Sequence, residues 1–354
     1  MSSYKTTTLT KIPIPESFAH PALPYIIDDF SLALYLGVRC KTVWYCITGG
    51  RRLYKRFTIK KSSGKPRYIY NPNNVLKYVQ RRIDKVILSK LPLLDCVGAY
   101  VEGKSCRDSA VQHVGQGVAV KIDLHDFFPT HTRARVRRFF RDDLGYSHNV
   151  SSIIASLCTV KETFHKDGKQ KAHVFVPQGS PVSPRLCNLI AQKHLDEPLL
   201  DALEKTGWVY TRYSDDLVLS HPDDVSRDAV RELIGLVIDH IHRAGYRMNP
   251  DKLRIQRRWH RQKMLGMVIN EHPNIPRDVY RHFRAVVFNC LNQGFTVNAL
   301  RYGDEYADTP GSFVAHLQGK ISYFHSVNPA RAARLAEVLN QAKEKHRDEH
   351  GQLL

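Results

Sequence analysis

The residues best suited to chemistry in this sequence are two adjacent carboxylates, Asp215 and Asp216. They lie between two apolar runs, residues 209–213 and 217–219, whose composition predicts two strands. The spacing therefore predicts a hairpin with the acidic pair at its tip. A divalent cation would stabilise two negative charges on one turn, because hard cations bind carboxylate oxygens. An ordinary Asp-rich turn is the alternative, since Asp is common in turns.

A third carboxylate follows another apolar run. Asp123 comes directly after residues 118–122, a composition that predicts a strand with the acidic residue at its end. A two-metal site needs a further ligand beside an Asp-Asp pair, and a strand-terminal Asp suits that position. We therefore expect Asp123, Asp215 and Asp216 to share one divalent-metal site.

Two other stretches have the composition of phosphate-binding segments. Residues 53–72 alternate apolar and basic side chains around a Ser-Ser-Gly turn, which predicts a basic hairpin. Lys61 and Arg67 near its tip suit phosphate oxygens, although charge runs are commonly just solvated. Residues 177–184 form a Gly-, Pro- and Ser-rich loop ahead of a predicted helix at 185–200. Such a loop lets a ligand approach the backbone, and the helix N-terminus favours phosphate.

The overall charge indicates a polyanionic partner. The chain of 354 residues has 53 Lys and Arg against 34 Asp and Glu, a net charge of +19. This excess favours nucleic acid first and an anionic membrane second, with a merely basic enzyme as the alternative. No apolar run reaches the roughly 18–20 residues that span a bilayer, and the N-terminus lacks the apolar core of a secretory signal. The seven cysteines show no paired spacing, so we expect free thiols in a cytoplasmic protein and no zinc site.

The remaining pattern predicts a mixed chain in which helices support these strands and loops. Apolar side chains recur at helical spacing in several segments, and Gly, Pro and Asn mark their ends. Basic residues gather between 243 and 263. We find no internal repeat and no linker long enough to separate independent domains. Helices are predicted near residues 26–46, 75–91, 108–113, 132–140, 185–200 and 228–244 and over most of 275–347, with a second basic hairpin at 161–176.

These segments occur in the order and spacing that is typical of a reverse transcriptase. The segment Asp123-Leu-His-Asp-Phe-Phe128 resembles the first palm motif of that family. Tyr213-Ser-Asp-Asp216 resembles its catalytic Tyr-x-Asp-Asp box, and residues 177–184 resemble its nucleotide-positioning loop. The resemblance covers roughly residues 50–330. The other segments that resemble the family are the fingers hairpin at 57–67, the fourth motif at Gly245-Tyr246, Asn249 and Lys252, and the primer-grip turn at Leu265-Gly266.

Within the family, the bacterial retron type is the most similar. Ser109-Ala-Val-Gln-His113 resembles the retron Asn-Ala-x-x-His box, with Ser in place of Asn. Met264-Leu-Gly-Met267 stands where retrons usually carry Val-Thr-Gly. A related antiphage reverse transcriptase with its own RNA template would look much the same. A group II intron protein fits less well, because Cys290 is the single cysteine after Cys187 and leaves no metal-binding endonuclease module.

The resemblance implies an α+β chain with the right-hand polymerase fold: fingers, a palm built on an antiparallel sheet, and a helical thumb. The implied domains are an N-terminal leader with short helices at 1–50, fingers at 51–118 and a palm at 119–262. A fingers segment at about 130–176 interrupts the palm, and the primer-grip turn and thumb occupy 263–354.

The resemblance also implies an RNA-directed DNA polymerase that extends a primer hydroxyl with dNTPs by two-metal nucleotidyl transfer. Asp123 and Asp215 would bridge two Mg²⁺ ions, or Mn²⁺, with Asp216 and the backbone carbonyl of Leu124 in support. Phe128 would lie under the sugar and exclude a 2′-hydroxyl, so the product would be DNA. Lys252 would act as general acid for the leaving pyrophosphate, and a plain surface lysine is the alternative.

Further residues are assigned to the nucleotide and to nucleic acid. A Gln-Gly pair in the loop at 177–184 would form the nucleotide platform, and basic residues would follow the phosphate backbone. A buried, hydrogen-bonded ring is the alternative for His113. The nucleotide-binding set is Lys61, Arg67, Asp126, Phe128, Gln178, Gly179 and Lys252. The template–primer set is His113, Arg133, Arg137, Arg138, Arg254, Arg257, Arg258, Leu265 and Gly266.

The expected partners follow from the retron resemblance. They are a dedicated structured non-coding RNA as template, the cDNA product, and a toxin or effector protein of an antiphage defence system. The product would be single-stranded DNA of the msDNA kind in a ribonucleoprotein, with no membrane partner. A non-catalytic RNA-binding protein on the same fold is the competing class. Three retained carboxylates argue against it, because they repel one another without serving a purpose.

Overall fold

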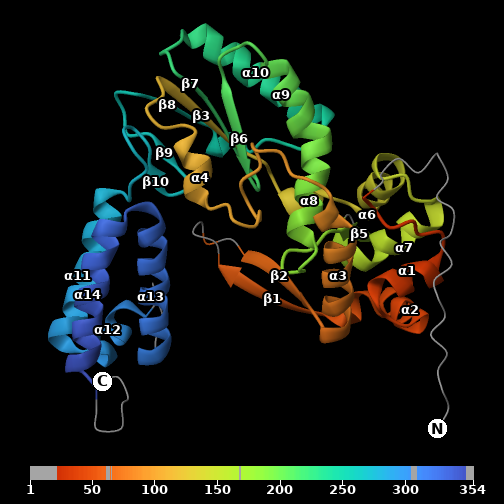
Figure 1. The fold of residues 1–354 in the computed structure, drawn as a ribbon, viewed down its shortest axis with the longest axis horizontal. Coiled ribbons are helices and arrows are strands. Elements are labelled where there is room, and N and C mark those ends of the chain that lie inside the picture. The colour runs from red at the N-terminus through yellow and green to blue at the C-terminus, as the bar shows by residue number, and fades with distance from the viewer. Residues whose placement is uncertain (1–21, 61–63, 65, 167–168, 304–308, 348–354) are drawn as a thin grey trace. The chain divides into compact units, whose positions relative to one another are not determined.

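The computed structural model describes residues 22–60, 64, 66–166, 169–303 and 309–347, and Figure 1 labels their helices and strands. The chain divides into two compact units, each assembled from three separate segments. We call them the first and the second unit. The first comprises Met1–Tyr100, Leu124–Asp201 and Leu236–Met248, and the second comprises Val101–Asp123, Ala202–Gly235 and Asn249–Leu354.

Two short helices open the first unit. α1 (Asp29–Leu36) begins after Asp28, whose side chain caps the first turn, and ends at Gly37 in the left-handed conformation. α2 (Cys40–Gly49) leads through the 3₁₀ turn η1 (Gly50–Leu53) into the first strand. The pair of short helices with a Gly stop is therefore confirmed.

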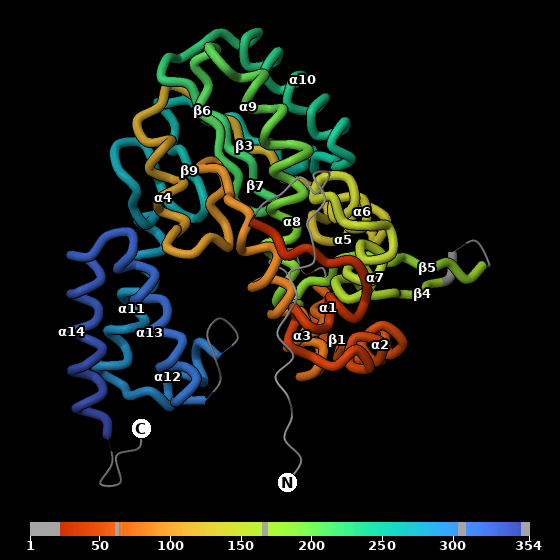
Figure 2. The backbone as a smooth tube through the Cα atoms, turned by 45° about the vertical axis from the view of Figure 1, so that its right-hand side comes forward, coloured from red at the N-terminus to blue at the C-terminus, as the bar shows by residue number. Residues whose placement is uncertain are grey.

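Two antiparallel hairpins belong to the first unit. β1 (Tyr54–Lys60) pairs with β2 (Pro66–Pro72), which confirms the basic hairpin predicted at 53–72. β4 (Val160–Lys166) pairs with β5 (Lys169–Phe175), as the pattern at 161–176 predicts. Figure 2 shows the β4–β5 hairpin projecting from the body of its unit.

The helices of the first unit mostly match the predicted segments, but their ends differ. α3 (Asn74–Val86) stops before residue 91, where the 3₁₀ turn η2 (Leu88–Lys90) replaces the last predicted turn. The predicted helices at 132–140 and 185–200 each contain a π-helical turn, a feature that apolar spacing does not reveal. The elements concerned are α6 (Arg133–Arg138) with η3 (Phe139–Asp143), and α8 (Ser183–Ala191) with η4 (Gln192–Asp196) and α9 (Glu197–Leu203). α5 (Phe127–Thr130) and α7 (His148–Cys158) complete the set.

The second unit is built on a four-stranded antiparallel sheet, as the resemblance predicts for a palm. Its strand order is β6–β7–β3–β8, so that β3 and β7 are the central strands (Figure 1). Their side chains are buried because helices and neighbouring strands cover them. The strands are β3 (Val118–Asp123), β6 (Val209–Tyr213), β7 (Asp216–His221) and β8 (Arg254–Arg257).

Three helical elements flank this sheet in sequence. α4 (Cys106–Val111) precedes β3 and begins at Ser105 with a reciprocal capping box. α10 (Arg227–Arg243) follows β7; its first half belongs to the second unit and its second half to the first. The 3₁₀ turn η5 (Pro250–Lys252) leads into β8.

A helical bundle ends the second unit. Phe283, Phe313 and Phe324 are fully buried at its centre, and β9 (Lys263–Met264) and β10 (Met267–Val268) form a small hairpin next to it. Asn328 caps the last helix by accepting a hydrogen bond from the backbone N–H of Arg331, and Pro329 is the first helical residue. The helices are α11 (Arg277–Gln293), α12 (Phe295–Tyr302), α13 (Pro310–Val327) and α14 (Pro329–Lys345).

The two units do not coincide with the fingers, palm and thumb ranges expected from the resemblance, and those boundaries stay a prediction. Among the described helices, none combines the length and the apolar composition needed to cross a membrane. The described cysteines are all free thiols, as their spacing predicts.

Candidate active site

The predicted carboxylates meet at one end of the central strands of the second unit. Asp123 is the last residue of β3 and lies opposite Asp216, the first residue of β7, in the antiparallel ladder. Asp215 precedes Asp216 in the turn, next to Ser214, which adopts the left-handed conformation with φ of 60°. The proximity of the three carboxylates is therefore confirmed, and their role as metal ligands stays a prediction.

Two lysines face these carboxylates. Lys252 Nζ lies 2.7 Å from Asp123 Oδ2, and Lys121 Nζ lies 3.0 Å from Asp216 Oδ2. The backbone N–H of Asn249 donates to the carbonyl of Asp123 at 2.8 Å and so fixes the turn that carries Lys252. Sequence reasoning placed Lys252 at this site but missed Lys121. Side chains alternate along a strand, so the position of Lys121 two residues before Asp123 was the available signal.

The surroundings of Asp215 in this cluster shift the pKa of its carboxyl group. Burial raises the pKa of its carboxyl, and the charges of Asp216 and Asp123 raise it further. For Lys252, burial alone would lower the pKa. The hydrogen bond and charge of Asp123, together with the charges of Asp215 and Asp216, outweigh burial and raise it. The cluster thus holds more negative charge than its lysines neutralise.

The donor set fits a hard divalent cation, because every candidate ligand is a carboxylate or carbonyl oxygen and the cluster favours added positive charge. Yet among the residues that the structure describes, no three His, Cys, Asp or Glu side chains are arranged around one point that would hold a metal. Asp123 and Asp216 are instead each turned toward a lysine. A metal bound by these carboxylates would have to replace Lys252 and Lys121 as their partners.

His113 corrects the sequence-based assignment to RNA. Its side chain is fully buried, and its ring nitrogens lie 2.7 Å from the hydroxyls of Ser220 and Thr211. Burial lowers the pKa of His113 to about 4, so the ring is neutral at physiological pH. The ring presents no surface to RNA. It joins the two strands of the Asp215–Asp216 hairpin, which agrees with the buried alternative.

The other predicted nucleotide residues belong to the first unit. Arg67 is exposed on β2, and Asp126 is exposed with a left-handed φ of 48°. Gln178 accepts a hydrogen bond from the backbone of Tyr70 at 2.8 Å, which attaches the Gln-Gly loop to the fingers hairpin. Leu124 also lies in this unit and is bridged to Met248, whereas Lys61 and the hairpin tip at 167–168 lie outside the described residues.

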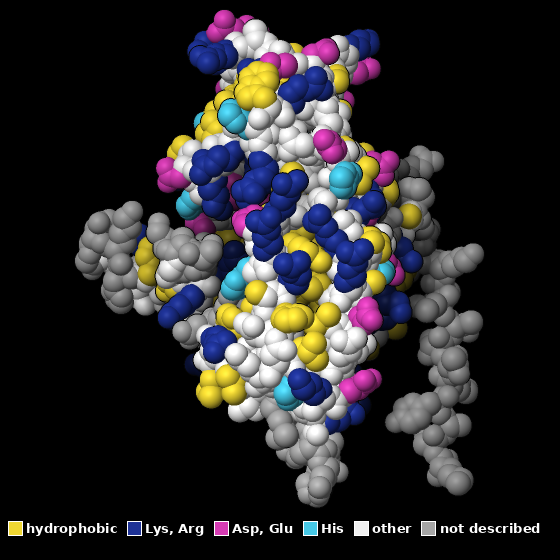
Figure 3. Space-filling view, turned by 90° about the vertical axis from the view of Figure 1, so that its left-hand side faces the viewer, with side chains coloured by type: hydrophobic (Ala, Val, Ile, Leu, Met, Phe, Trp, Pro, Cys, Tyr) yellow, Lys and Arg dark blue, Asp and Glu magenta, His cyan; other side chains and the backbone are white. Residues whose placement is uncertain are grey.

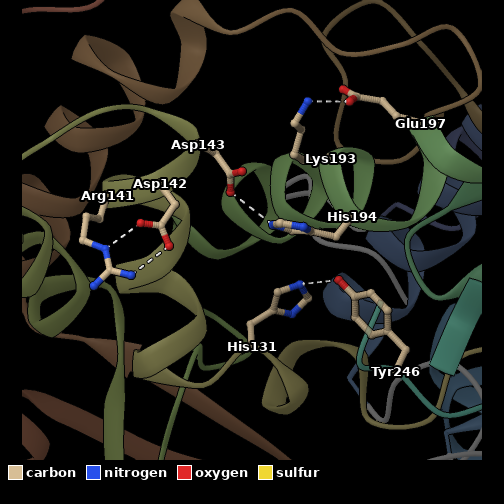
Figure 4. A network of polar contacts seen from close by, with 8 residues as sticks. All are labelled: His131, Arg141, Asp142, Asp143, Lys193, His194, Glu197 and Tyr246. Atoms are coloured by element: carbon tan, nitrogen blue, oxygen red, sulfur yellow. Dashed lines mark hydrogen bonds and ion pairs between the residues drawn. The ribbon is translucent and has the colours of Figure 1, made fainter. Parts of the chain in front are cut away.

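Phe128, the predicted sugar filter, lies in the short helix α5 and is largely buried. His131 holds this helix, since its Nδ1 lies 2.7 Å from the carbonyl of Phe127 and its Nε2 lies 2.8 Å from the Tyr246 hydroxyl. Figure 4 shows the His131–Tyr246 contact. The guanidinium of Arg135 lies over the ring of Tyr246, 4.2 Å from the ring centre. Sequence reasoning missed His131, whose spacing from Phe127 on one helical turn was the only signal.

The arginines predicted to contact template and primer differ in their exposure and in their hydrogen-bond partners. Arg133 and Arg138 are exposed on α6, Arg137 is half-buried, and Arg258 is exposed after β8. Arg254 folds back onto the carbonyls of Asp251 and Leu253. Arg257 differs most from the prediction, because Asp224 and the carbonyl of Val225 bind its guanidinium. Both bonds come from its Nη1 and the side chain is mostly buried, so the contact of Arg257 with template or primer stays a prediction.

The turn between β9 and β10 holds the predicted primer grip. Leu265 and Gly266 both adopt the left-handed conformation, with φ of 49° and 81°. A Cβ on Gly266 would lie 3.3 Å from the Tyr323 hydroxyl, so the turn packs closely on α13. Its contact with a primer stays a prediction.

Comparison with known proteins identifies the family. The family model described as reverse transcriptase (RNA-dependent DNA polymerase) matches residues 59–269, which include the three carboxylates and Lys252. The chain belongs to the reverse transcriptase family. The reverse transcriptase of retron Mx65 from Myxococcus xanthus is 32% identical over 338 residues, covering 92% of this chain and 74% of the relative.

Two further relatives agree. The retron Mx162 reverse transcriptase of Myxococcus xanthus is 32% identical over 312 residues, covering 82% of this reverse transcriptase and 61% of the relative. The retron Ec86 reverse transcriptase of Escherichia coli is 28% identical over 296 residues, covering 83% and 82%. This reverse transcriptase is therefore an RNA-directed DNA polymerase of the retron type with the right-hand polymerase fold.

Proposed function

We propose that this reverse transcriptase copies a dedicated structured RNA into single-stranded DNA, with Asp123, Asp215 and Asp216 as its metal ligands. The observation that carries the proposal is the meeting of these carboxylates with Lys252 at one end of the central strands. The similarity to retron reverse transcriptases favours a non-coding RNA template, an msDNA-type product in a ribonucleoprotein and a role in antiphage defence with an effector protein.

Each of these residues would have a different task in the polymerase reaction. Two Mg²⁺ or Mn²⁺ ions, when bound, lower the energy of the negative charge that develops on the attacking and leaving oxygens. Asp123 and Asp215 would bridge them, with Asp216 and the Leu124 carbonyl in support. Lys252, whose ammonium lies 2.7 Å from Asp123, would donate a proton to the leaving pyrophosphate.

The carboxylate proposal is tested by Asp215→Asn. Neutralising this side chain should lower primer extension with dNTPs and Mg²⁺ by at least about a thousandfold, because metal positioning is the main catalytic contribution. The melting temperature should hold or rise, since repulsion from the neighbouring carboxylates is removed. Asp278→Asn, at an exposed Asp paired with Arg261, is the matched control and should extend primers normally. Extension by Asp215→Asn at the wild-type rate would contradict the catalytic role of Asp215. No extension by the wild type would favour the competing RNA-binding protein without catalysis.

The sugar filter is tested by Phe128→Ala. Removing the ring should open space beside C2′, so the ratio of kcat/KM for dNTP over rNTP should fall by at least about tenfold. Tyr246→Phe keeps the stacking but breaks the bond to His131, and should lower the ratio by less. Unchanged discrimination in Phe128→Ala would assign the ring to packing alone.

The nature of the RNA is tested by sequencing the nucleic acid that copurifies with the enzyme. A branched RNA–DNA molecule is the expected product of retron-type priming. Long or repetitive cDNA would instead assign the enzyme to a different antiphage reverse transcriptase with its own template.

A further inference from the structure

A groove of about 870 Å³ lies between the first turns of α10 and the edge strand β8, with all of its lining in the second unit. The lining combines cationic side chains on one wall with apolar side chains on the other. Arg227 and Arg231 line one wall from α10, and Ile255 and Trp259 line the other from β8 and the turn after it. His260 adds a titratable ring at the end. Of the groove's lining, Arg257 alone belongs to the residues assigned above to template and primer.

The groove is remote from the carboxylates. In the β3–β8 ladder Val118 pairs with Arg257, whose Cα belongs to the groove wall, whereas Asp123 is the last residue at the opposite end of β3. Five residue steps along a strand correspond to about 17 Å. Asp224, at the near end, likewise follows β7 at the end opposite Asp216. A ligand in the groove therefore does not touch the reacting atoms.

Trp259 is presented on a fixed turn. Its side chain is 63% exposed, a large apolar area to leave in water. The Asn270 amide donates to the carbonyls on both sides of it, to Arg258 at 3.1 Å and to His260 at 2.8 Å. The backbone N–H of Arg258 donates to the Gly117 carbonyl at 2.9 Å. A rigid aromatic ring loses little conformational entropy on binding, so this arrangement favours a stacking partner.

The charge of the groove favours a polyanion. Arg227 and Arg231 are exposed, and the ion pair of Arg231 with Asp228 is itself in solvent and easily exchanged. Arg257 and Asp224, which form an ion pair, also line the groove. Figure 3 shows Lys and Arg side chains gathered across the side of the second unit that carries β8, β9 and the C-terminal helices. An exposed aromatic ring on one wall and arginines on the other suit the bases and the phosphates of a single strand.

We propose that this groove binds a single-stranded segment of RNA, with one base stacked on Trp259 and adjacent phosphates bound by Arg227 and Arg231. The choice of RNA over DNA rests on the proposed function, because the template is bound before any DNA product exists. The site anchors RNA away from the carboxylates and contributes affinity without contributing to the chemical step.

The test uses the full-length chain and a labelled single-stranded RNA of about ten nucleotides, within the range of sites built from stacking and phosphate contacts. Trp259→Ala should weaken binding by about 5- to 150-fold, the loss of one stacked base. Trp259→Phe should recover most of it, because a ring is restored. Arg227→Gln and Arg231→Gln should each weaken binding and flatten its dependence on salt. A photoactivatable uridine in the RNA should crosslink to Trp259 or its neighbours.

Matched controls separate this site from the polymerase site. Phe30→Ala and Arg39→Gln remove an exposed ring and an exposed charge from α1 and the start of α2, and should bind RNA like the wild type. Trp259→Ala should extend a short template–primer duplex at the wild-type rate. Asp215→Asn should keep the crosslink even if the proposed catalytic role is correct, so the two proposals can fail independently.

Three results would overturn the inference. One is wild-type RNA affinity in Trp259→Ala and in the Arg227→Gln, Arg231→Gln double variant. Another is a Trp259-dependent affinity that appears with single-stranded DNA and not with RNA. The third is Trp259-dependent binding of an acidic peptide or of anionic lipid vesicles without a matching effect on RNA.

Discussion

Lys121 and Lys252 partly neutralise the negative charge of the carboxylate cluster. Each lysine binds one carboxylate, Asp216 or Asp123, whereas burial and the two neighbouring carboxylates raise the pKa of Asp215. If these carboxylates are the metal ligands, as proposed, divalent cations would have to replace the ammonium groups.

His113 gives a prediction at the residue level that depends on pH. Its pKa of about 4 in the folded chain is below the ordinary value of 6.5. Between these values the unfolded chain binds more protons, so the free energy of unfolding falls as pH decreases. From pH 7 to pH 5 this one group should lower it by about 2 kcal/mol.

His113→Gln keeps a polar group at this position but does not titrate. Urea unfolding at both pH values should show a smaller loss for His113→Gln than for the wild type, by about that amount. Equal pH dependence would mean that the ring is protonated in the folded chain. His148→Gln, at the start of α7 on an exposed position, is the control and should follow the wild type.

The sequence identified the acidic residues because they end strands, and the alternation of strand side chains explains why Asp123 meets Asp216. The sequence could not decide whether His113 contacts RNA or is a buried ring, because both alternatives need one histidine near polar partners. Burial arises from packing between α4 and the Asp215–Asp216 hairpin, segments about a hundred residues apart, which no local pattern reports.

The loop after β5 depends on a glycine at one position. Gly179 has φ of 103°, and a Cβ there would lie 2.7 Å from Ile69 Cγ2 and 2.9 Å from the Tyr70 carbonyl. A side chain would therefore push the loop away from β2 and break the Gln178–Tyr70 backbone bond. The Gln-Gly pair is thus attached to the hairpin of β1 and β2, and its role as a nucleotide platform stays a prediction.

Gly179→Ala should lower the free energy of unfolding by about 2 kcal/mol and raise the KM for dNTPs. Gly235→Ala is the control, because Gly235 lies within α10 and an added Cβ would meet nothing within 4 Å. That substitution should stabilise the enzyme by up to about 1 kcal/mol through helix propensity. Thermal melts and dNTP titrations measure both effects. Equal stability in the two variants would contradict the contact with β2.

Elements with strong periodicity were predictable, and their irregularities were not. Pro129 lies in the first turn of α5, where a helix needs no proline N–H, so this proline does not prevent the helix. The π-helical turns in η3 and η4 add a residue to a helix without changing its apolar faces enough to show in the sequence.

The whole molecule has the charge of a polyanion-binding protein, +19 over 354 residues. Affinity for single-stranded RNA should fall steeply with salt, with a slope of log K against log salt of about −3 or steeper. Filter binding at several salt concentrations measures the slope. An RNA affinity insensitive to salt would exclude phosphate contacts as the main source of binding.

The division into two units could not be predicted, because each unit is assembled from three separate segments. The absence of long linkers correctly argued against independent consecutive domains, but local patterns do not report which segments pack together. The family resemblance supplied the fold class, since motif order is a property of the chain, whereas the packing of segments is a property of long-range contacts.

The edge strand β8 also affects how the protein behaves before it meets RNA. A sheet edge offers unpaired backbone groups to any other strand, which promotes aggregation. β8 is short and begins and ends with arginine, and β6 at the other edge is little longer. Positive charge at a short edge repels an identical edge on a second copy. The same arginine-rich composition that suits a nucleic-acid protein therefore protects its central sheet from self-association.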